Sequence, residues 1–457
     1  MKFEQKLNNT LKVLIFLFII LQFIFIFVYN IHYDEREHLH AAYLIHNSQI
    51  PYVDFFEHHM PFLWFSISGF MLLPAIISIF ASRILIFLFS LGIVFLVYKI
   101  SSKYYSKTAA LFACFLLLSF RQFFISSFLV RPDTISAFFL LLSLFFILKT
   151  DVKSKKVEFN YFLIGLFMCT SVLFQIKAVF LILPLLLVLL FKKKLTLKNF
   201  GLFVIGGIIP LILLCAALGF SIAKLKVFCF LTTYFNLHIS GGNPILYNLL
   251  TYIEVNSFFI IALLFAIFDF KYLKKNKTFA FLVIFSLLFL VFFAKTGLIG
   301  PQYFLYVLPF FVIFSAPKLT SLFFNQKTRK LFMILFVVLG MLLPLAAVTF
   351  EFYRADLKTD LKELRFFLNN NDVSKPSLDD GWLIFHKNAD YLWFSQQDYA
   401  GLLISNGIIT EFNLTKLILE KPEFIKTAFL RLDDNEKQFI EQNYILTDFN
   451  DLYMLKK

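Results

Sequence analysis

The sequence predicts an all-α polytopic membrane protein with about eleven transmembrane helices, followed by a small C-terminal α/β domain. Three observations carry this prediction. Apolar residues make up 60% of the 457 residues, and only 16% are charged. Apolar runs recur from Leu11 to Phe350, and many approach the roughly 20 residues that a helix needs to cross a bilayer. From residue 351 onward the chain becomes polar and acidic, as expected of a domain in water.

The first apolar run, Leu11 to Tyr29, follows a short basic start with Lys2, Lys6 and Lys12. A signal peptide begins in the same way. This run is longer than the usual signal-peptide core and lacks a small-residue cleavage site, so we interpret it as a retained span. Further spans are predicted near residues 78–98, 108–126, 134–149, 159–175, 178–191, 199–220, 254–270, 279–295, 302–317 and 331–350.

Positive charge is unequally divided between the two ends of these spans. One set of ends carries 22 Lys and Arg residues, including Lys271, Lys274, Lys275 and Lys277, and the alternate ends carry eight. Because cytoplasmic loops are enriched in Lys and Arg, the richer side is predicted to be cytoplasmic. The N-terminus would then be cytoplasmic in a cell (inner) membrane, and the C-terminal domain would lie outside.

The formal net charge of +14 does not indicate nucleic-acid binding. Residues 1–350 hold 30 Lys and Arg against 11 acids, whereas residues 351–457 hold 13 against 18. The excess lies in short loops between apolar runs, which is the pattern of membrane topology. The four cysteines stand singly, so neither a zinc knuckle nor a disulfide framework is predicted.

Residues 351–457 are predicted to form a soluble extracytoplasmic α/β domain, separate from a transmembrane domain at 1–350. A helix is expected over 355–368, because Leu357, Leu361 and Leu364 share one face. The turn residues 379–381 precede an expected strand at 382–385. The segment 423–430, a second helix near 433–442 and the segment 444–449 complete the α/β pattern.

Residues 33–62, between the first two apolar runs, are polar and rich in ionisable groups. With His32 directly before them, they carry five acids and six of the eight histidines of the chain, namely Asp34, Glu35, Glu37, Asp54, Glu57, His32, His38, His40, His46, His58 and His59. Ionisable groups are costly near a membrane, so a cluster on one loop usually has a function. A short interfacial helix is expected between Glu35 and Asn47, ended by residues 49–52, and Pro61 starts the next helix.

This segment resembles a known family. The residues that carry the resemblance are Tyr33-Asp34-Glu35, Ala42, Pro51-Tyr52, Asp54 and His58-His59-Met60-Pro61-Phe62. They are similar to the first outer loop of the GT-C membrane glycosyltransferases, in particular the group of protein O-mannosyltransferases, aminoarabinose transferases and RgtA/B/C/D-like proteins. Further similar segments are Arg131-Pro132-Asp133, Lys177 and Pro301-Gln302-Tyr303-Phe304. Ser48 departs from the family pattern, which has a glycine there, and Met60 departs from a proline.

The resemblance implies a GT-C-like fold and a glycosyltransferase that moves a hexosyl or pentosyl group. The donor would be a polyprenyl-phosphate-linked sugar. The acceptor would be a hydroxyl of an envelope glycan, a lipid or a protein on the outer face. Because phosphate is a good leaving group, the acceptor hydroxyl needs a base more than the donor needs an acid. One carboxylate attacking from the side opposite the phosphate would invert the anomeric centre.

Residue roles follow from the same resemblance. Asp34 is the predicted general base, and Glu35 orients it or binds metal. Cations such as Arg131, Lys177 and His59 would stabilise the charge that develops on the phosphate. The predicted substrate-binding residues are Asp54, His58, His59, Arg131, Asp133, Lys177, Gln302 and Tyr303.

Several of these residues also have a structural interpretation. Asp133 can pair with Arg131 or cap the following helix. Lys177 can be an interfacial lysine, and Gln302 and Tyr303 can be ordinary residues of the membrane interface. A divalent metal is a possible cofactor, because acids and histidines cluster here, although no short-range ligand spacing marks a site.

Three other functions remain open on the sequence. A transporter or flippase of lipid-linked saccharides would usually place ionisable residues at mid-membrane. A polymerase or ligase of surface polysaccharide would use outer-loop arginines, of which this chain has few. A non-catalytic membrane anchor would leave the acidic loop unexplained.

Overall fold

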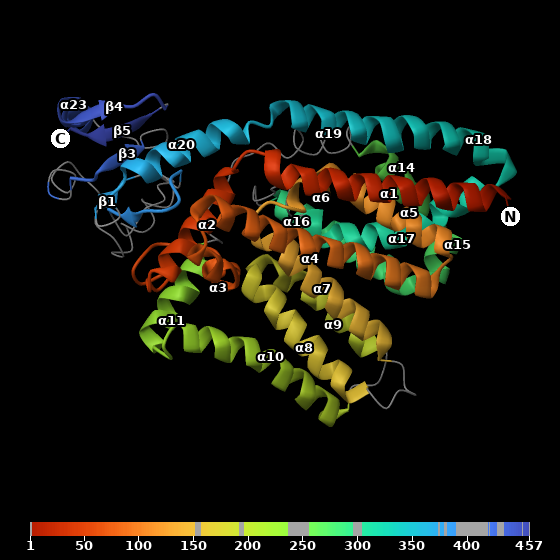
Figure 1. Ribbon diagram of the computed structural model, residues 1–457. Helices are drawn as coiled ribbons and strands as arrows, with labels where there is room; N and C mark the ends of the chain where they lie inside the picture. Colours follow the sequence, from red (N-terminus) through yellow and green to blue (C-terminus); the bar gives the residue numbers. More distant parts are fainter. Residues whose placement is uncertain are drawn as a thin grey trace. The chain divides into compact units, whose positions relative to one another are not determined.

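The structure, a computed structural model, describes most of the chain (Figure 1). The described residues are 2–150, 157–191, 196–235, 256–295, 304–372, 375–378, 382–389, 419, 421–426, 434–449 and 451–456. The chain forms two compact units, each built from segments that are discontinuous in sequence. Unit 1 comprises Met1–Phe27, Arg83–Leu214 and Ser240–Ala355, and unit 2 comprises Val28–Ser82, Cys215–Ile239 and Asp356–Lys457.

The described elements of unit 1 are all helical, joined by short turns. Its elements are α1 (Lys2–Val28), most of α4 (Ala75–Tyr104), α5 (Lys107–Ser119), α6 (Arg121–Ser126), α7 (Pro132–Lys149), α8 (Val157–Phe174), the 3₁₀ turn η2 (Ile176–Ala178), α9 (Val179–Phe191), α10 (Leu197–Ala217), α14 (Ser257–Ile267), α15 (Phe270–Lys275), α16 (Lys277–Lys295), α17 (Phe304–Phe324), α18 (Gln326–Leu335), the π-helical turn η5 (Phe336–Leu342) and α19 (Leu343–Arg354). Phenylalanine rings fill the contacts between these helices.

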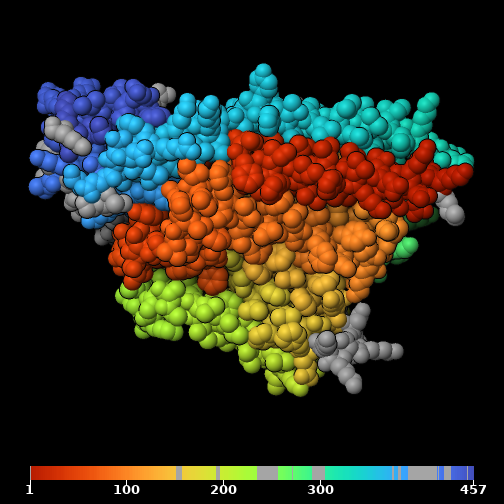
Figure 2. Space-filling view, in the orientation of Figure 1, coloured from red at the N-terminus to blue at the C-terminus, as the bar shows by residue number. Residues whose placement is uncertain are grey.

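Helices from the two ends of the sequence lie side by side in unit 1. The guanidinium of Arg329 on α18 lies 4.7 Å from the centre of the Phe3 ring on α1, and the rings of Phe25 and Phe352 are 6.0 Å apart. Figures 1 and 2 show the same adjacency, with α1 in red beside α18 and α19 in cyan. The last helices of unit 1 therefore pack along the first one.

Within the described residues, seven helices are long and apolar enough to cross a membrane, namely α1, α4, α7, α8, α10, α17 and the helical run that starts at Gln326. The predicted ranges that remain fall on the shorter apolar helices α5, α9, α14 and α16. The predicted multi-pass helical membrane protein is therefore confirmed. The number of crossings, eleven, stays a prediction.

One predicted span is interrupted. The range 108–126 was expected as a single helix, but α5 ends at Ser119 and α6 starts at Arg121. Phe120 between them has an extended backbone, with φ −71° and ψ 116°. The Arg121 side chain pairs with Glu351 on α19, so the helix breaks where a charged contact replaces apolar packing.

Unit 2 combines the polar loop with the C-terminal segment. Its elements are α2 (Tyr33–His46), α3 (Phe62–Ile67), the 3₁₀ turn η1 (Ser68–Leu72), α11 (Ile222–Cys229), the π-helical turn η3 (Phe230–Phe235), α20 (Leu357–Asn370), β1 (Pro376–Ser377), β2 (Lys387–Asn388), β3 (Phe424–Lys426), α23 (Asp434–Asn443), β4 (Tyr444–Leu446) and β5 (Leu452–Leu455). The predicted interfacial helix and the two helices of the C-terminal segment correspond to α2, α20 and α23. Whether residues 351–457 form a domain of their own stays a prediction.

The described part of the C-terminal segment contains a small sheet. Strand β5 lies between β3 and β4 and is antiparallel to both, with Ile425 opposite Tyr453. Because successive side chains of a strand point to opposite faces, Phe424 packs with Phe367 whereas Ile425 packs with Ile440. The sheet therefore has an apolar cluster on each face.

The prediction of a strand at residues 382–385 is wrong. The short strand in this region is β2, at Lys387–Asn388, where it pairs in parallel with β1. The backbone carbonyls of Trp382 and Ile384 instead accept hydrogen bonds from side chains of α2. These carbonyls are therefore not available to a neighbouring strand. The turn expected at 379–381 lies outside the described residues.

Candidate active site

The first turn of α2 holds two acidic residues in different environments. His32 Nδ1 accepts a hydrogen bond from the Asp34 backbone N–H at 3.3 Å, and the Glu35 carboxylate accepts one from the His32 N–H at 3.4 Å. This reciprocal pair is a capping box. Glu35 is fully buried and holds the start of the helix, whereas the Asp34 side chain is 32% exposed. Of the two predicted catalytic carboxylates, Asp34 is the one that solvent reaches.

Four side chains from α2 and the following loop form a compact group, which we call the acid–histidine cluster: Glu37, Glu57, His58 and His59. One ligand atom from each lies within 4.8 Å of the others. His59 Nδ1 is 3.1 Å from Glu37 Oε1 and 3.0 Å from Glu57 Oε1. Glu57 Oε1 also accepts the backbone N–H groups of His58 and His59, at 2.9 and 3.2 Å. The loop is thus folded around the Glu57 carboxylate.

Burial and charge set the protonation of this cluster. Burial and the nearby Glu57 carboxylate raise the pKa of Glu37 to about 8. Burial by itself would lower the pKa of His59, but the carboxylates of Glu37 and Glu57 outweigh it and raise that pKa to about 10. Burial would raise the pKa of Glu57, but the hydrogen bond and charge of His59 dominate and lower it. Near neutral pH the cluster therefore holds a protonated Glu37, an ionised Glu57 and a cationic His59.

The donor set and spacing of the cluster fit a divalent metal ion. Ligand atoms about 2.0–2.1 Å from a tetrahedral zinc ion are about 3.3 Å from one another. Three of the distances between cluster atoms are 3.0, 3.1 and 3.5 Å. Two carboxylates and two imidazoles are ligands that Zn²⁺ and Mn²⁺ accept. A bound ion would replace the protons that His59 and Glu37 carry.

Aromatic residues hold the histidines of the loop in place. The indole N–H of Trp64 on α3 donates to His38 Nδ1 at 3.1 Å, and the ring centres of His38 and His59 are 4.9 Å apart. The Tyr52 hydroxyl donates to the His59 carbonyl at 2.6 Å. Trp64 is fully buried. The orientation of His59 is therefore fixed by side chains that take no part in the cluster itself.

The loop between α2 and α3 contains two residues with left-handed backbone conformation. Ser48 has φ 66° and Tyr52 has φ 68°. Ser48 stands where the family pattern has a glycine, which is the residue that adopts positive φ most readily. The conformation persists without the glycine. Asp54 shapes the same loop, because its carboxylate accepts the Ile50 N–H at 2.7 Å.

Other charged residues of α2 bind the C-terminal segment instead. The Arg36 guanidinium donates to Asp360 at 2.8 Å and to the Trp382 carbonyl at 2.9 Å, and it lies 4.6 Å from the centre of the Trp382 ring. His40 contacts the Ile384 carbonyl and Asn388. One face of α2 thus carries the cluster, and another anchors residues 356–389.

The predicted site residues of unit 1 form a second group. Asp133, in the first turn of α7, is 2% exposed and accepts a hydrogen bond from the Tyr306 hydroxyl at 3.1 Å. Arg131 Nε is 3.5 Å from the same carboxylate. Lys177 lies in η2, which packs against α7. Gln302 and Tyr303 lie outside the described residues.

Three residues of these groups were not predicted as site residues. Glu37 follows Asp34 by three positions and so shares its face of α2. Glu57 directly precedes the predicted His58. Tyr306 lies one helical turn after the predicted Tyr303. Helical spacing alone could have drawn attention to Glu37 and Tyr306, but only the folded loop brings Glu57 to Glu37.

Comparisons with known proteins agree on the fold. A family model described as dolichyl-phosphate-mannose-protein mannosyltransferase matches residues 58–220. The crystal structure of ArnT from Cupriavidus metallidurans in the apo state matches with a TM-score of 0.69 and 11% identity, covering 98% of this chain and 97% of that one. The chain has the fold of the GT-C membrane glycosyltransferases. The predicted resemblance to the GT-C group is therefore confirmed, although no curated protein sequence matches the chain.

Two further structures extend the likeness to the GT-C fold. ArnT from Cupriavidus metallidurans bound to undecaprenyl phosphate has a TM-score of 0.63 at 11% identity and covers 87% of this chain and 88% of that one. The Archaeoglobus fulgidus oligosaccharyltransferase in complex with Zn and sulfate has a TM-score of 0.52 at 13% identity. That match covers 84% of this chain and 62% of the oligosaccharyltransferase.

Proposed function

We propose that this GT-C protein transfers a sugar from a polyprenyl-phosphate donor to an acceptor hydroxyl on the outer face of the membrane, with inversion at the anomeric carbon. The proposal rests on one observation, namely that two carboxylates of α2 lie in different environments. Asp34 is a solvent-accessible carboxylate, and Glu37, on the same helix face, belongs to the acid–histidine cluster. Asp34 offers a base for the acceptor, and His59 of the cluster offers a cation for the donor.

The transfer step needs a base and a stabilised leaving group. Asp34 would accept the proton of the acceptor hydroxyl while the oxygen of that hydroxyl bonds to the anomeric carbon. The bond from that carbon to the phosphate oxygen would break, and polyprenyl phosphate would leave with the electron pair. General-base assistance of this kind contributes about 10²–10⁴-fold in rate.

Positive charge near the phosphate is available from the chain. His59 is cationic near neutral pH, because the carboxylates of the cluster raise its pKa to about 10. Arg131 and Lys177 are the further predicted contacts. A divalent ion held by Glu37, Glu57, His58 and His59 would take the place of the protons on Glu37 and His59, and would then supply the positive charge for an anionic donor in place of the His59 cation. Glu35 acts on the start of α2 rather than on substrate, and so serves as a positioning residue.

The comparisons support the class of donor. The matching family model is named for dolichyl-phosphate-mannose. One of the ArnT structures is bound to undecaprenyl phosphate, and the oligosaccharyltransferase structure contains Zn. These ligands belong to the matched proteins. For this chain, the matches support the proposal of a polyprenyl-phosphate donor and of a bound metal.

The deciding experiment profiles lipid-linked and surface glycans by mass spectrometry in cells that lack the protein. Three variants are reintroduced: the wild type, Asp34→Asn, and the matched control Glu441→Gln, which neutralises an exposed carboxylate of α23. We expect the deletion to lose one sugar and to accumulate its lipid-linked donor. The wild type and the control should restore the sugar, and Asp34→Asn should not, at equal amounts in the membrane.

Two results would contradict the proposal. Full restoration by Asp34→Asn would remove Asp34 as the base. Accumulation of a finished lipid-linked saccharide on the inner side, with transfer intact in membrane extracts, would favour the flippase alternative.

A further inference from the structure

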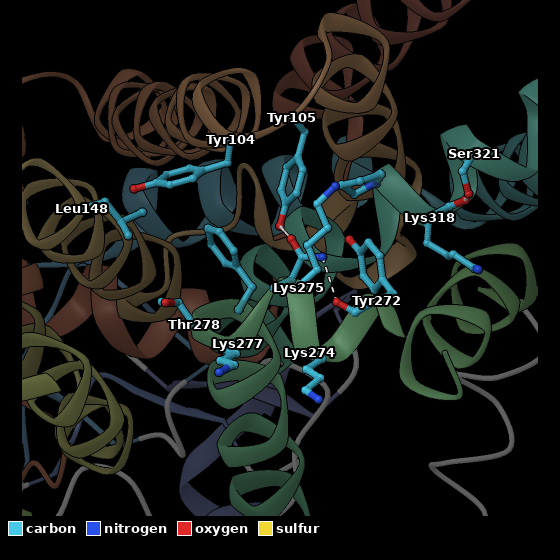
Figure 3. A pocket seen from close by; sticks show the side chains of 13 residues that line it. Tyr104, Tyr105, Leu148, Tyr272, Lys274, Lys275, Lys277, Thr278, Lys318 and Ser321 are labelled. Carbon is cyan, nitrogen blue, oxygen red and sulfur yellow. Dashed lines mark hydrogen bonds between the residues drawn. The ribbon is translucent and has the colours of Figure 1, made fainter. Parts of the chain in front are cut away.

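A pocket of about 860 Å³ lies in unit 1 between the end of α4, α15, the start of α16 and the end of α17. It is lined by three exposed lysines, Lys274, Lys275 and Lys277, which we call the rim lysines, and by Tyr104, Tyr105 and Tyr272 (Figure 3). It is separate from the Asp133–Tyr306 pair. Tyr306 and Lys318 lie at opposite ends of α17, and twelve helical residues correspond to about 18 Å.

The start of α16 lies at this pocket. The first N–H groups of a helix have no partner within the helix, and a residue such as Asn276, directly before α16, usually accepts one of them with its side chain. Here the Asn276 side-chain oxygen instead accepts the Tyr105 hydroxyl, at 2.9 Å. The Asn276 side-chain oxygen is thus bonded to Tyr105, and the first residues of α16, Lys277, Thr278 and Phe279, line the pocket.

An apolar groove adjoins the pocket. It is lined by Leu264, Phe265 and Phe268 of α14 and its end, and Lys318 lines both the groove and the pocket. The Phe268 side chain is 73% exposed, and Leu264 and Phe265 are nearly half exposed. Lys318 is paired with Asp269 at 2.5 Å, and the other lysines that line the pocket are the three rim lysines. A basic pocket next to an exposed apolar groove matches a ligand with a charged head and a long hydrocarbon chain.

We propose that this pocket binds the phosphate monoester headgroup of a membrane lipid, with the lipid chain lying along the α14 groove. A monoester carries more charge and more free oxygens than a phosphodiester, so three ammonium groups and a helix N-terminus favour it. The sequence prediction places this end of unit 1 on the cytoplasmic side. The site would thus be distinct from the outer-face chemistry and independent of the proposed transfer reaction.

The test measures lipid binding to the full-length protein in detergent by native mass spectrometry. The probes are dioleoyl phosphatidic acid, which is a monoester, and dioleoyl phosphatidylglycerol, which is a diester. We expect phosphatidic acid to bind the wild type at least about tenfold more tightly. The variant Lys274→Gln/Lys275→Gln/Lys277→Gln should lose at least about tenfold in affinity, since each lysine near an anionic headgroup adds to the attraction.

Matched variants separate the pocket from general surface charge. Lys6→Gln/Lys327→Gln/Lys330→Gln removes three exposed lysines outside the pocket and should bind as the wild type does. Replacing the three rim lysines by arginine should preserve binding, which keeps the test decisive if the glutamine variant folds poorly. Leu264→Ser/Phe268→Ser should weaken phosphatidic acid binding by removing the groove contacts.

Each alternative result overturns the proposal. Equal loss in the two lysine-to-glutamine variants would show non-specific attraction to the surface. Equal affinity for the two lipids would remove the monoester preference. Displacement of phosphatidic acid by inorganic phosphate at matching concentration, with no effect of the groove variant, would identify a site for free phosphate instead of a lipid.

Discussion

At the scale of single residues, burial and charge determine how protons are distributed among the side chains of the acid–histidine cluster. Glu37, Glu57 and His59 share contacts of about 3 Å, so no member of the cluster has an independent charge state. Near neutral pH Glu37 is protonated, and the positive charge of His59 offsets the negative charge of Glu57, so these three side chains are neutral overall. The His59 imidazolium is the cation that the cluster can offer to an anionic donor.

The same cluster predicts a pH-dependent stability. The folded pKa of His59, about 10, lies above its unfolded value near 6.5, so its contribution is complete below about pH 6.5 and is lost as pH rises through about 10. The raised pKa of Glu37 acts in the same direction, because folding disfavours its ionised form. Without metal, the melting temperature in detergent should therefore fall between about pH 7 and pH 10.

Bound metal should offset this loss of stability at high pH. Because His59 and Glu37 must give up protons to bind an ion, added Zn²⁺ or Mn²⁺ should stabilise the protein more at about pH 9 than at about pH 7. Thermal unfolding with and without a chelator measures the effect, and Glu57→Gln should abolish it. A metal-induced shift of the melting temperature that is equal at both pH values, or that survives in Glu57→Gln, would rule out the cluster as the metal site.

At the scale of elements, the close packing of α8 on α10 depends on glycine. A methyl group at Gly165 would collide with the backbone carbonyl of Phe203, and one at Gly206 would collide with the carbonyl of Phe162. Small residues that let helix backbones approach are typical of membrane helix pairs. Gly201, on the same helix α10, has open space around it.

This difference gives a matched pair of variants. Gly165→Ala should destabilise the protein by about 1–3 kcal/mol, because the two helices must separate. Gly201→Ala should be neutral or stabilising by up to about 1 kcal/mol, because alanine is the better helix former. Thermal unfolding in detergent compares the two, and equal melting temperatures would show that α8 and α10 do not pack as described.

Element α2 illustrates how one helix serves two tasks. Glu37 contributes to the cluster, whereas Arg36 and His40 bind the carbonyls of Trp382 and Ile384. Arg36 also pairs with Asp360, with both side chains largely buried. Since breaking a buried ion pair leaves an uncompensated charge, α2 links the C-terminal segment to the loop that carries the acid–histidine cluster.

At the scale of the whole molecule, charge patterning sets the expected orientation. If the lysine-rich ends are cytoplasmic, single cysteines introduced at Lys327 and Lys437 in a background without the four native cysteines should differ in labelling. A membrane-impermeant maleimide applied to intact cells should label position 437 and not position 327. Labelling of position 327 alone would invert the topology and move the proposed chemistry to the cytoplasmic side.

The sequence by itself determined the membrane class, the helical ranges and the segment that carries the acidic and histidine residues. Those features follow from apolar run length and local composition, which need no tertiary information. It also placed α2 and α20 correctly, because their helical spacing is strong. It failed at 382–385, where β-type residues lie in an extended segment whose carbonyls are taken by Arg36 and His40.

Only the tertiary structure decided which of these residues act together. Glu57 comes close to Glu37 because the loop after α2 reverses through residues with positive φ, and the Glu35 carboxylate takes part in the capping box at the start of α2. The pairing of Asp133 with Tyr306 joins two helices that are far apart in sequence. Local patterns fix what each segment becomes, but contacts between distant segments depend on packing, and the charge state of a carboxylate or imidazole depends on those contacts.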